Sequence, residues 1–284
     1  MGTAARIGLF AAILALVFGV GALAGGAFGP EGRGEEEVAS SSHGASSHGE
    51  SSPEAASEAA AGSHSSGHSG HGAAGAEHAL ALAADTHPLG KAAPLRFTVR
   101  DGADVVTDFD VTHTKRMHVI VVREDLTTFQ HLHPEMADDG TFETPLTLKS
   151  PGRYRVFADH ETGGAKAAPS ATLTVPGRPQ PRQIPAPDTT RDLPGGYTVS
   201  FTRDGDVISF GVTHGGAEVE LDPYLGAAGH LVVLSVDDLE YLHTHPRGDE
   251  LDFEVEVPQT GTHRMFLQFS HGGTVHTADF TAEL

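Results

Sequence analysis

The sequence predicts an all-β protein built from two tandem immunoglobulin-like β-sandwich domains. The composition, with 35 glycines, 17 prolines and no tryptophan, is typical of turn-rich β-structure rather than of a helical bundle. Short alternating apolar runs are separated by turn residues at intervals of about 8 to 12 residues, as in sandwich folds. The same succession of runs occurs twice, which indicates an internal repeat.

Each repeat is expected to contribute about seven short strands. The first domain is predicted over residues 95–176, with strands at 95–100, 104–113, 117–123, 128–133, 141–148, 153–160 and 170–175. The second is predicted over residues 196–284, with strands at 197–202, 207–214, 230–236, 240–245, 251–257, 262–269 and 275–284. Every run is short enough for a strand and is separated from the next by turn residues such as Gly, Pro or Asp.

Residues 1–29 are expected to be a signal peptide or membrane anchor. Arg6 precedes an uncharged apolar run over 7–28, and Ala22 and Ala24 provide a small-residue cleavage pattern. Left uncleaved, the run is long enough to cross a bilayer, which takes roughly 20 residues. Acidic residues follow it, so the rest of the chain is expected outside the cytoplasm, either anchored or secreted.

Two segments of the chain are expected to be linkers. Residues 30–94 are dominated by Ser, Gly, Ala, Glu and His, and are predicted to be disordered because they cannot bury enough apolar surface. This linker carries seven histidines that can capture metal weakly or serve as a plain polar spacer: His43, His48, His64, His68, His71, His78 and His87. Residues 177–195 are rich in proline and are predicted to form a semi-extended spacer.

Charge and cysteine content exclude several classes of function. The chain has 38 acidic and 18 basic residues, for a net charge of −20, which disfavours nucleic acid as a partner. The chain has no cysteine, which excludes disulfides, thiolate zinc sites and cysteine-ligated copper.

A histidine spacing that occurs twice carries the functional hypothesis. Both copies read His-x12-His-x-His-Pro, and the second copy is shifted by 112 residues. The first copy consists of His118, His131 and His133, and the second of His230, His243 and His245. Imidazole is a preferred ligand of zinc, copper and nickel, so the pattern indicates a metal site in each domain.

Hairpin geometry explains how this spacing could converge on an ion. If each copy forms a symmetric antiparallel hairpin, Ile120 faces His131 and Val232 faces His243. Strand alternation then places all three histidines of a copy on one face, together with apolar residues. Opposed positions lie about 4.5 to 5.5 Å apart, which suits convergence on one ion. The apolar members of the face lead us to expect that it looks into its own sandwich, with the histidines at one end.

A fourth ligand could come from a neighbouring strand end or from water. The candidate histidines are His113 and His160 in the first domain and His214, His271 and His276 in the second. The all-nitrogen donor set favours copper(II) or zinc over calcium or magnesium. Met117, Met136 and Met265 leave copper(I) open.

The repeats also match outside the hairpin and differ in one place. The segment 111–113 aligns with 212–214, since both read Val-Thr-His. His118 follows His113 by five positions, whereas His230 follows His214 by sixteen, so a longer loop is expected near the second hairpin.

The chain resembles a group of exported bacterial proteins with immunoglobulin-like modules that are loosely labelled heavy-metal binding. The matching stretches are 117–134, which reads MHVIVVREDLTTFQHLHP, then 139–142 and 151–159. This resemblance implies a secreted or membrane-associated protein. The second domain departs from the pattern at Tyr241 and His263.

The sequence suggests three classes of function, of which the first is favoured over the second and the second over the third. The first is an extracytoplasmic protein that sequesters copper or zinc or delivers it to a transporter or chaperone. The second is a structural or partner-binding pair of sandwiches, in which the histidines merely satisfy strand ends. An enzyme is not expected, because nucleophile, phosphate-loop and dinucleotide motifs are lacking; a three-histidine zinc hydrolase would be the one route.

Overall fold

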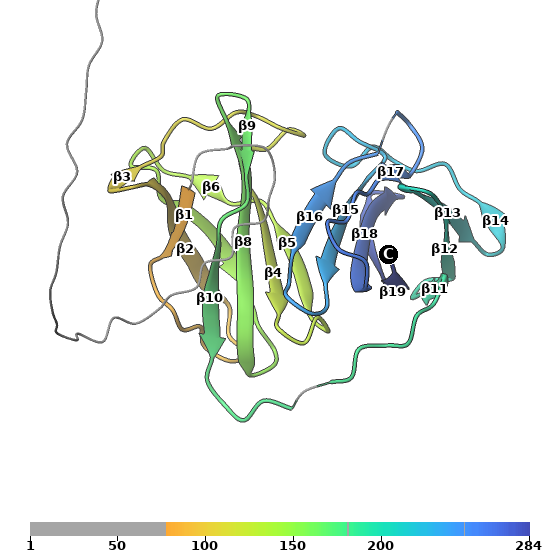
Figure 1. Ribbon diagram of the computed structural model, residues 1–284, viewed down its shortest axis with the longest axis horizontal. Coiled ribbons are helices and arrows are strands. Elements are labelled where there is room, and N and C mark those ends of the chain that lie inside the picture. Colours follow the sequence, from red (N-terminus) through yellow and green to blue (C-terminus); the bar gives the residue numbers. More distant parts are fainter. Residues whose placement is uncertain (1–77, 181, 247) are drawn as a thin grey trace, which may run out of the picture. The chain divides into compact units, whose positions relative to one another are not determined.

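The computed structural model describes residues 78–284 apart from 181 and 247, and this part is all-β (Figure 1). Both sandwiches lie in one compact unit of the chain. Within the described part, no helix is long and apolar enough to cross a membrane. The predicted signal segment and most of the predicted histidine-rich linker lie outside the described residues.

The first sandwich has the strand order of an immunoglobulin-like domain. Its first sheet runs β1-β2-β7-β6, and β3 pairs with β2. Its second sheet runs β10-β8-β4-β5, and β9 pairs with β8. In immunoglobulin notation these orders are A-B-E-D and G-F-C-C′. The bounds are β1 His78–Leu82, β2 Ala93–Asp101, β3 Asp104–Val105, β4 His118–Arg123, β5 Phe129–Leu132, β6 Glu135–Met136, β7 Phe142–Leu146, β8 Gly152–Thr162, β9 Ala165–Ala167 and β10 Ser170–Val175.

The second sandwich repeats one of these sheets and alters the other. The sheet β16-β15-β18-β19 has the same order as β5-β4-β8-β10. The other sheet runs β11-β12-β13-β14, and β17 pairs with β13, whereas its counterpart β7 pairs with β2 directly. The bounds are β11 Thr190–Leu193, β12 Tyr197–Asp204, β13 Val207–His214, β14 Ala217–Glu218, β15 Gly229–Ser235, β16 Tyr241–Thr244, β17 Asp252–Glu254, β18 Thr262–His271 and β19 Thr274–Glu283.

The two sheets that carry the repeated histidines, β10-β8-β4-β5 and β16-β15-β18-β19, are buried on both faces. In β4 every residue is buried, and alternate side chains belong to different clusters. Val119 and Val121 pack in the core of the first sandwich, while Ile120 and Val122 point to the opposite face. A strand covered on both sides needs a continuous apolar run, which is what 119–122 provides.

The outward faces of these two sheets pack against each other. One cluster joins Ile120, Val122 and Phe157 of the first sandwich with Val232, Leu234 and Phe266 of the second. Phe129 stacks on Phe266 with ring centroids 4.3 Å apart, and Phe157 stacks on Tyr241 at 4.6 Å. The expectation that the histidine face looks into its own sandwich is therefore wrong. It faces the other sandwich, because the interior of each sandwich is already filled by the alternate residues of the same strands.

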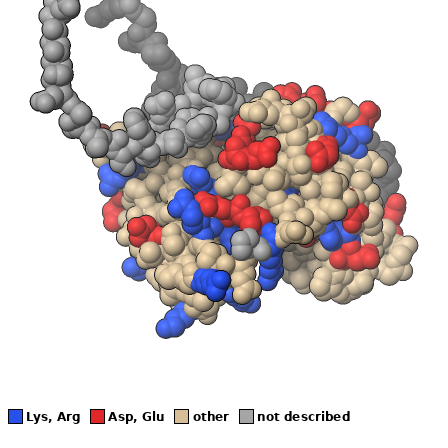
Figure 2. Space-filling view, turned by 60° about the horizontal axis from the view of Figure 1, so that its bottom comes forward, with Lys and Arg blue, Asp and Glu red and all other residues tan. Residues whose placement is uncertain are grey.

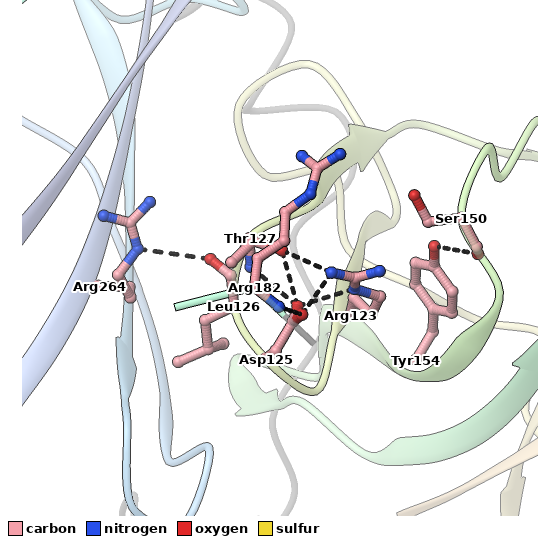
Figure 3. Close-up of polar contacts among 8 residues, drawn as sticks. All are labelled: Arg123, Asp125, Leu126, Thr127, Ser150, Tyr154, Arg182 and Arg264. Atoms are coloured by element: carbon pink, nitrogen blue, oxygen red, sulfur yellow. Dashed lines mark hydrogen bonds and ion pairs between the residues drawn. The ribbon is translucent and has the colours of Figure 1, made fainter. Parts of the chain in front are cut away.

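The turn between β4 and β5 is held by polar contacts within the turn and from the second sandwich (Figure 3). Arg123 and Asp125 form an ion pair, and Thr127 donates its hydroxyl to Asp125 at 2.8 Å. From the second sandwich, Arg264 Nε donates to the carbonyl of Leu126 at 3.4 Å. These contacts fix the turn at which the register of the histidine hairpin is set.

A buried tyrosine supports the immunoglobulin-like assignment. Tyr154 on β8 is buried, and its hydroxyl donates to the carbonyl of Ser150 at 2.8 Å (Figure 3). A tyrosine that bonds back to backbone a few residues upstream is the tyrosine corner of this fold.

Both predicted linkers end earlier than the sequence suggested. Residues 30–94 were expected to be disordered, yet His78–Leu82 forms β1 and pairs with β2 from His78↔Asp101 to Leu82↔Phe97. Residues 177–195 were expected to be a spacer, yet Thr190–Leu193 pairs with β12. Both are short edge strands, of five and four residues, so their backbone pairing leaves little trace in the side-chain pattern.

Acidic and basic side chains are interspersed on the face shown in Figure 2. The large net negative charge is therefore not expressed there as one continuous acidic patch.

Candidate metal centre

The two hairpins have the predicted register. Ile120 pairs with His131 in β4 and β5, and Val232 pairs with His243 in β15 and β16. Both hairpins accordingly place their three histidines on the face that meets the other sandwich. The local geometry was predicted correctly, but its consequence was not, because the two triads meet.

All six repeated histidines form one cluster between the sandwiches. Within the first triad, ring centroids lie 4.6 to 5.3 Å apart, and within the second 4.5 to 5.8 Å. Contacts between the triads are equally close. The ring of His243 lies 5.1 Å from His118 and 5.2 Å from His131, so the two expected sites are one site.

The first histidine of each triad is anchored to a backbone carbonyl in equivalent turns. His118 Nε2 lies 3.2 Å from the carbonyl oxygen of Thr112, and His230 Nε2 lies 3.0 Å from that of Tyr224. Because a carbonyl can only accept, Nε2 carries the proton in both rings. The lone pair of each ring is then on Nδ1, which faces the cluster.

The middle histidine of each triad is anchored to the opposite sandwich. His131 Nδ1 lies 2.8 Å from Gln268 Oε1, and His243 Nδ1 lies 2.6 Å from Asp159 Oδ2. Asp159 pairs with His118 across β4 and β8, and Gln268 pairs with His230 across β15 and β18, so the two acceptors are repeat counterparts. Both outer Nδ1 atoms donate, which leaves the lone pair on Nε2 facing inward.

These anchors bring lone pairs together without protons between them. His118 Nδ1 and His131 Nε2 are 3.1 Å apart, although both rings carry their proton on the other nitrogen. Four further nitrogens are buried and have no hydrogen-bond partner among the described residues: His133 Nε2, His230 Nδ1, His243 Nε2 and His245 Nε2. Buried polar atoms are rarely left unpaired, so such a group calls for an explanation.

The donor atoms lie at distances that suit metal coordination. Those of His118, His131 and His133 all lie within 4.8 Å of one another, and so do those of His118, His230 and His243. The 3.1 Å between two facing nitrogens corresponds to bonds of about 2.0 to 2.1 Å at an angle of about 100°.

Burial keeps these imidazoles neutral. Desolvation, with a smaller contribution from neighbouring histidines, lowers the pKa of His133 to about 3 and that of His230 to about 4. Burial also holds the pKa of His131, His243 and His245 well below the ordinary value. A neutral imidazole is the form that binds a metal ion.

The aromatic residue two positions before the middle histidine of each triad differs in the same way as the acceptor to which that histidine binds. Tyr241 donates its hydroxyl to Asp159 Oδ2 at 3.0 Å, so this carboxylate accepts two bonds from the second sandwich. The counterpart of Tyr241 is Phe129, which has no donor, and the counterpart of Asp159 is the neutral Gln268. Tyr241, at which the second domain differs from the family pattern, is therefore part of the site.

His113 is a seventh histidine at the cluster. Its ring stacks on His245 with centroids 3.5 Å apart. His113 and Thr114 both have positive φ, at 50° and 67°, in a two-residue turn closed by bonds between Thr112 and Lys115. Such a type I′ turn normally favours Gly or Asn, so its conformation is strained here.

The structural counterpart of this turn is not the Val-Thr-His segment at 212–214. It is Tyr224–Ala227, with Leu225 and Gly226 at positive φ and the same pair of backbone bonds. The extra residues of the second repeat precede this turn. His113 therefore corresponds to Leu225, and the alignment of His113 with His214 is wrong.

The other predicted ligands lie elsewhere. His160 Nε2 contacts His78 Nδ1 at 2.8 Å. His271 Nδ1 contacts the hydroxyl of Tyr197 at 2.7 Å, and the rings of His214 and His276 pack against the same tyrosine. Of the five proposed fourth ligands, only His113 reaches the cluster.

Sulfur does not contribute to the site. Met117 is buried in the core of the first sandwich and Met265 in that of the second, while Met136 packs against the first core. This placement leaves nitrogen as the donor type and removes the argument for copper(I).

Asp159 and Gln268 were not identified as site residues from the sequence. Asp159 ends the stretch 151–159 that carries the family resemblance, which was a usable signal. Gln268 had none, because its role depends on contact between the two sandwiches.

The space beside the cluster is small. A pocket of about 30 Å³ is lined by His118, Asp159, His243 and His245, with Lys115 and Lys166 also in its wall. That volume holds a water or a small ion. A larger hollow of about 260 Å³ elsewhere in the first sandwich contains His87, whose ring nitrogens face backbone carbonyls.

One known protein family matches most of this chain. Residues 73–177 and 195–284 match the profile of a family described as Domain of unknown function (DUF8832), and they make up more than half of the chain. The chain belongs to the DUF8832 family. The two DUF8832 segments cover the two sandwiches except for β11, and the first includes β1, in agreement with the corrected boundary of the first sandwich.

Solved structures are only distantly similar to this DUF8832 chain. A tetra-tandem repeat from the extending region of a large adhesion protein is 12% identical with a TM-score of 0.26, over 73% of this chain and 48% of that one. The adhesin InvE of Yersinia pseudotuberculosis is 13% identical with a TM-score of 0.25, over 73% and 59%. Salmonella alpha-2-macroglobulin is 12% identical with a TM-score of 0.27, over 76% and 15%. The chain thus spans less than two thirds of each, and no curated protein matches it.

Proposed function

We propose that this chain is a metal-binding protein that holds copper or zinc in the histidine cluster between its two sandwiches. The observation that carries the proposal is the pair of facing nitrogens on His118 and His131. Both rings donate their proton outward, so the two lone pairs meet at 3.1 Å with no hydrogen between them. A cation at this position removes the repulsion and satisfies both atoms.

The outer bonds of the rings support the same conclusion. Metal-binding histidines usually donate their second N–H to a carboxylate, carbonyl or amide, which fixes the ring and its tautomer. Four rings here have such an acceptor: the carbonyls of Thr112 and Tyr224, Asp159 and Gln268. A histidine with a purely structural role would not require its unprotonated nitrogen to be held facing the other imidazoles.

The ion follows from the chemistry of the donors. Six neutral imidazoles without thiolate or thioether suit copper(II) and zinc, and copper(II) generally binds nitrogen sites more tightly than zinc does. Calcium and magnesium prefer oxygen ligands and are disfavoured.

A binding role fits better than catalysis on an organic substrate. The pocket beside the cluster holds about 30 Å³, whereas ligand pockets are typically some 300 to 1,000 Å³. A partner-binding module is also less well supported, because the apolar sheet faces are already packed against each other. Large exposed apolar side chains within the described part are scattered: Leu89, Val111, Val207 and Val275.

The sequence supports a site of action outside the cytoplasm. The basic residue and apolar run at the N-terminus are typical of export, and the resemblance to exported proteins loosely labelled heavy-metal binding points the same way. We therefore propose sequestration of copper or zinc in an extracytoplasmic compartment, or its delivery to a transporter or chaperone.

Titration of the full-length chain with zinc and copper(II) at pH 7 tests this function. The background should carry Asn in place of the histidines ahead of β1, namely His43, His48, His64, His68 and His71, so that binding by the linker does not obscure the result. His118→Ala combined with His230→Ala, which removes the first histidine of both triads, should lower the affinity at least tenfold. His214→Ala, whose ring packs on Tyr197 away from the cluster, is the matched control. Equal affinity of the double variant and the background protein, or absence of binding below millimolar metal, would rule the function out.

A further inference from the structure

The histidine cluster contains more inward-facing donors than one ion can use. Zinc in proteins is almost always four-coordinate, and its histidine sites have three or four protein ligands. Four anchored imidazoles direct lone pairs into the cluster, and His133 and His245 add buried Nε2 atoms that have no partner among the described residues. If one ion bound to His118, His131 and His133, the inward nitrogens of His230, His243 and His245 would remain buried and unpaired.

The second triad has the features that qualify the first. His230 is anchored through Nε2 to a carbonyl, as His118 is, and His243 through Nδ1 to the opposite sandwich, as His131 is. The ring of His245 lies 4.5 Å from His243 and 4.8 Å from His230, which matches the spacing of His133 to its partners. The two halves of the cluster therefore match in their anchors and in their ring spacing.

The two halves are also adjacent. The donor atom of His118 lies within 4.8 Å of those of His230 and His243, as well as of those of its own triad. One lone pair cannot serve two ions, so with two ions His118 belongs to the first and His245 completes the second. Ions held in this way are near neighbours, because the rings of the two triads interleave at 5.1 and 5.2 Å.

We infer that the cluster is a paired centre that binds two ions, one on each histidine triad. This inference rests on the proposed function and extends it from a metal site to a dinuclear one. The small pocket reaches His118 of one triad and both His243 and His245 of the other.

Stoichiometry and magnetic coupling test the inference together. The full-length chain with the five linker histidines changed to Asn is loaded with copper(II) and freed of loosely held metal by dialysis against a weak chelator. Copper per chain is measured by elemental analysis, and the electron paramagnetic resonance spectrum is integrated. We expect two copper ions per chain, with either a half-field transition or an integrated intensity below the copper content, since both mark neighbouring spins.

Counterpart variants separate the two halves of the centre. His133→Ala and His245→Ala should each retain one copper per chain with a full, uncoupled signal. His271→Ala, whose ring contacts Tyr197, should retain two. One copper in the unsubstituted background would overturn the paired centre and leave the metal-binding function intact. Two copper ions with uncoupled spectra would also overturn it, whereas no copper would defeat the function itself.

Discussion

Single residues decide the tautomer of each imidazole and therefore where its lone pair points. Asp159 and Gln268 occupy equivalent positions on β8 and β18, and each accepts the Nδ1 proton of a histidine from the opposite sandwich. The site is thus completed across the interface by side chains that are not themselves metal ligands. This exchange ties the geometry of each triad to the presence of the other domain.

Asp159→Asn should weaken metal binding while leaving the fold intact. The amide keeps an acceptor oxygen but loses the negative charge, so it orients His243 less firmly and lowers its basicity. Loss of such a supporting group typically costs about 10- to 100-fold in affinity. The readout is a zinc competition titration against a chelator of known affinity. Asp138→Asn, at an exposed position of the same sandwich, is the control. An unchanged affinity for Asp159→Asn would show that the carboxylate has no supporting role.

At this scale the sequence predicted the repeated ligands but not their partners. The spacing identified His118, His131, His133 and their counterparts, because side chains alternate between the two faces of a strand and the spacing therefore shows which of them share a face. Asp159 and Gln268 could not be placed, since contacts between domains leave no periodic signal in the chain.

At the scale of elements, β4 and β15 link the cores of the sandwiches to the interface. Each strand sends alternate residues to its own core and to the opposite sandwich, and for this reason both read as continuous apolar runs. The prediction of strand positions and hairpin register was correct here. The direction of the histidine face was wrong, because alternation defines two faces and does not say which one meets the interior.

Truncation of an interface aromatic should destabilise the protein and the site together. Phe266 is buried, stacks on Phe129 across the interface and lies under the guanidinium of Arg264. Phe266→Ala should lower the free energy of unfolding by about 3 to 5 kcal/mol. Urea denaturation measures this loss, and zinc titration of the folded variant should show weaker binding. Val275→Ala, at a side chain that is 44% exposed, should change neither. A loss below about 1 kcal/mol for Phe266→Ala would argue against a packed interface.

At the scale of the whole molecule, the duplication acquires a physical role. Neither repeat can assemble the cluster alone, because each supplies half of the ligands and half of the anchoring acceptors. The all-β class and the two sandwiches were predicted from composition and strand spacing. Their mutual packing was not, since it follows from which faces remain after each core is filled.

Acid should destabilise the metal-free protein. In the unfolded chain a histidine takes up a proton near pH 6.5, whereas burial lowers the pKa of His230 to about 4 in the folded state. Between these values the unfolded state binds more protons, so stability falls as the pH falls from about 6.5 to about 4. His230 alone contributes on the order of 3 kcal/mol across this window. Urea denaturation at a series of pH values measures the slope, and His230→Gln should flatten it. A stability that is constant over this range would contradict the buried, neutral state of the cluster.

The most direct test of the central claim is a crystal structure of the zinc-loaded chain with anomalous diffraction recorded at the zinc absorption edge. We predict anomalous density between the two sandwiches, bonded to Nδ1 of His118 and His230 and to Nε2 of His131 and His243. Crystals that hold zinc only at other sites, or in which these imidazoles turn away from each other, would contradict a shared metal centre.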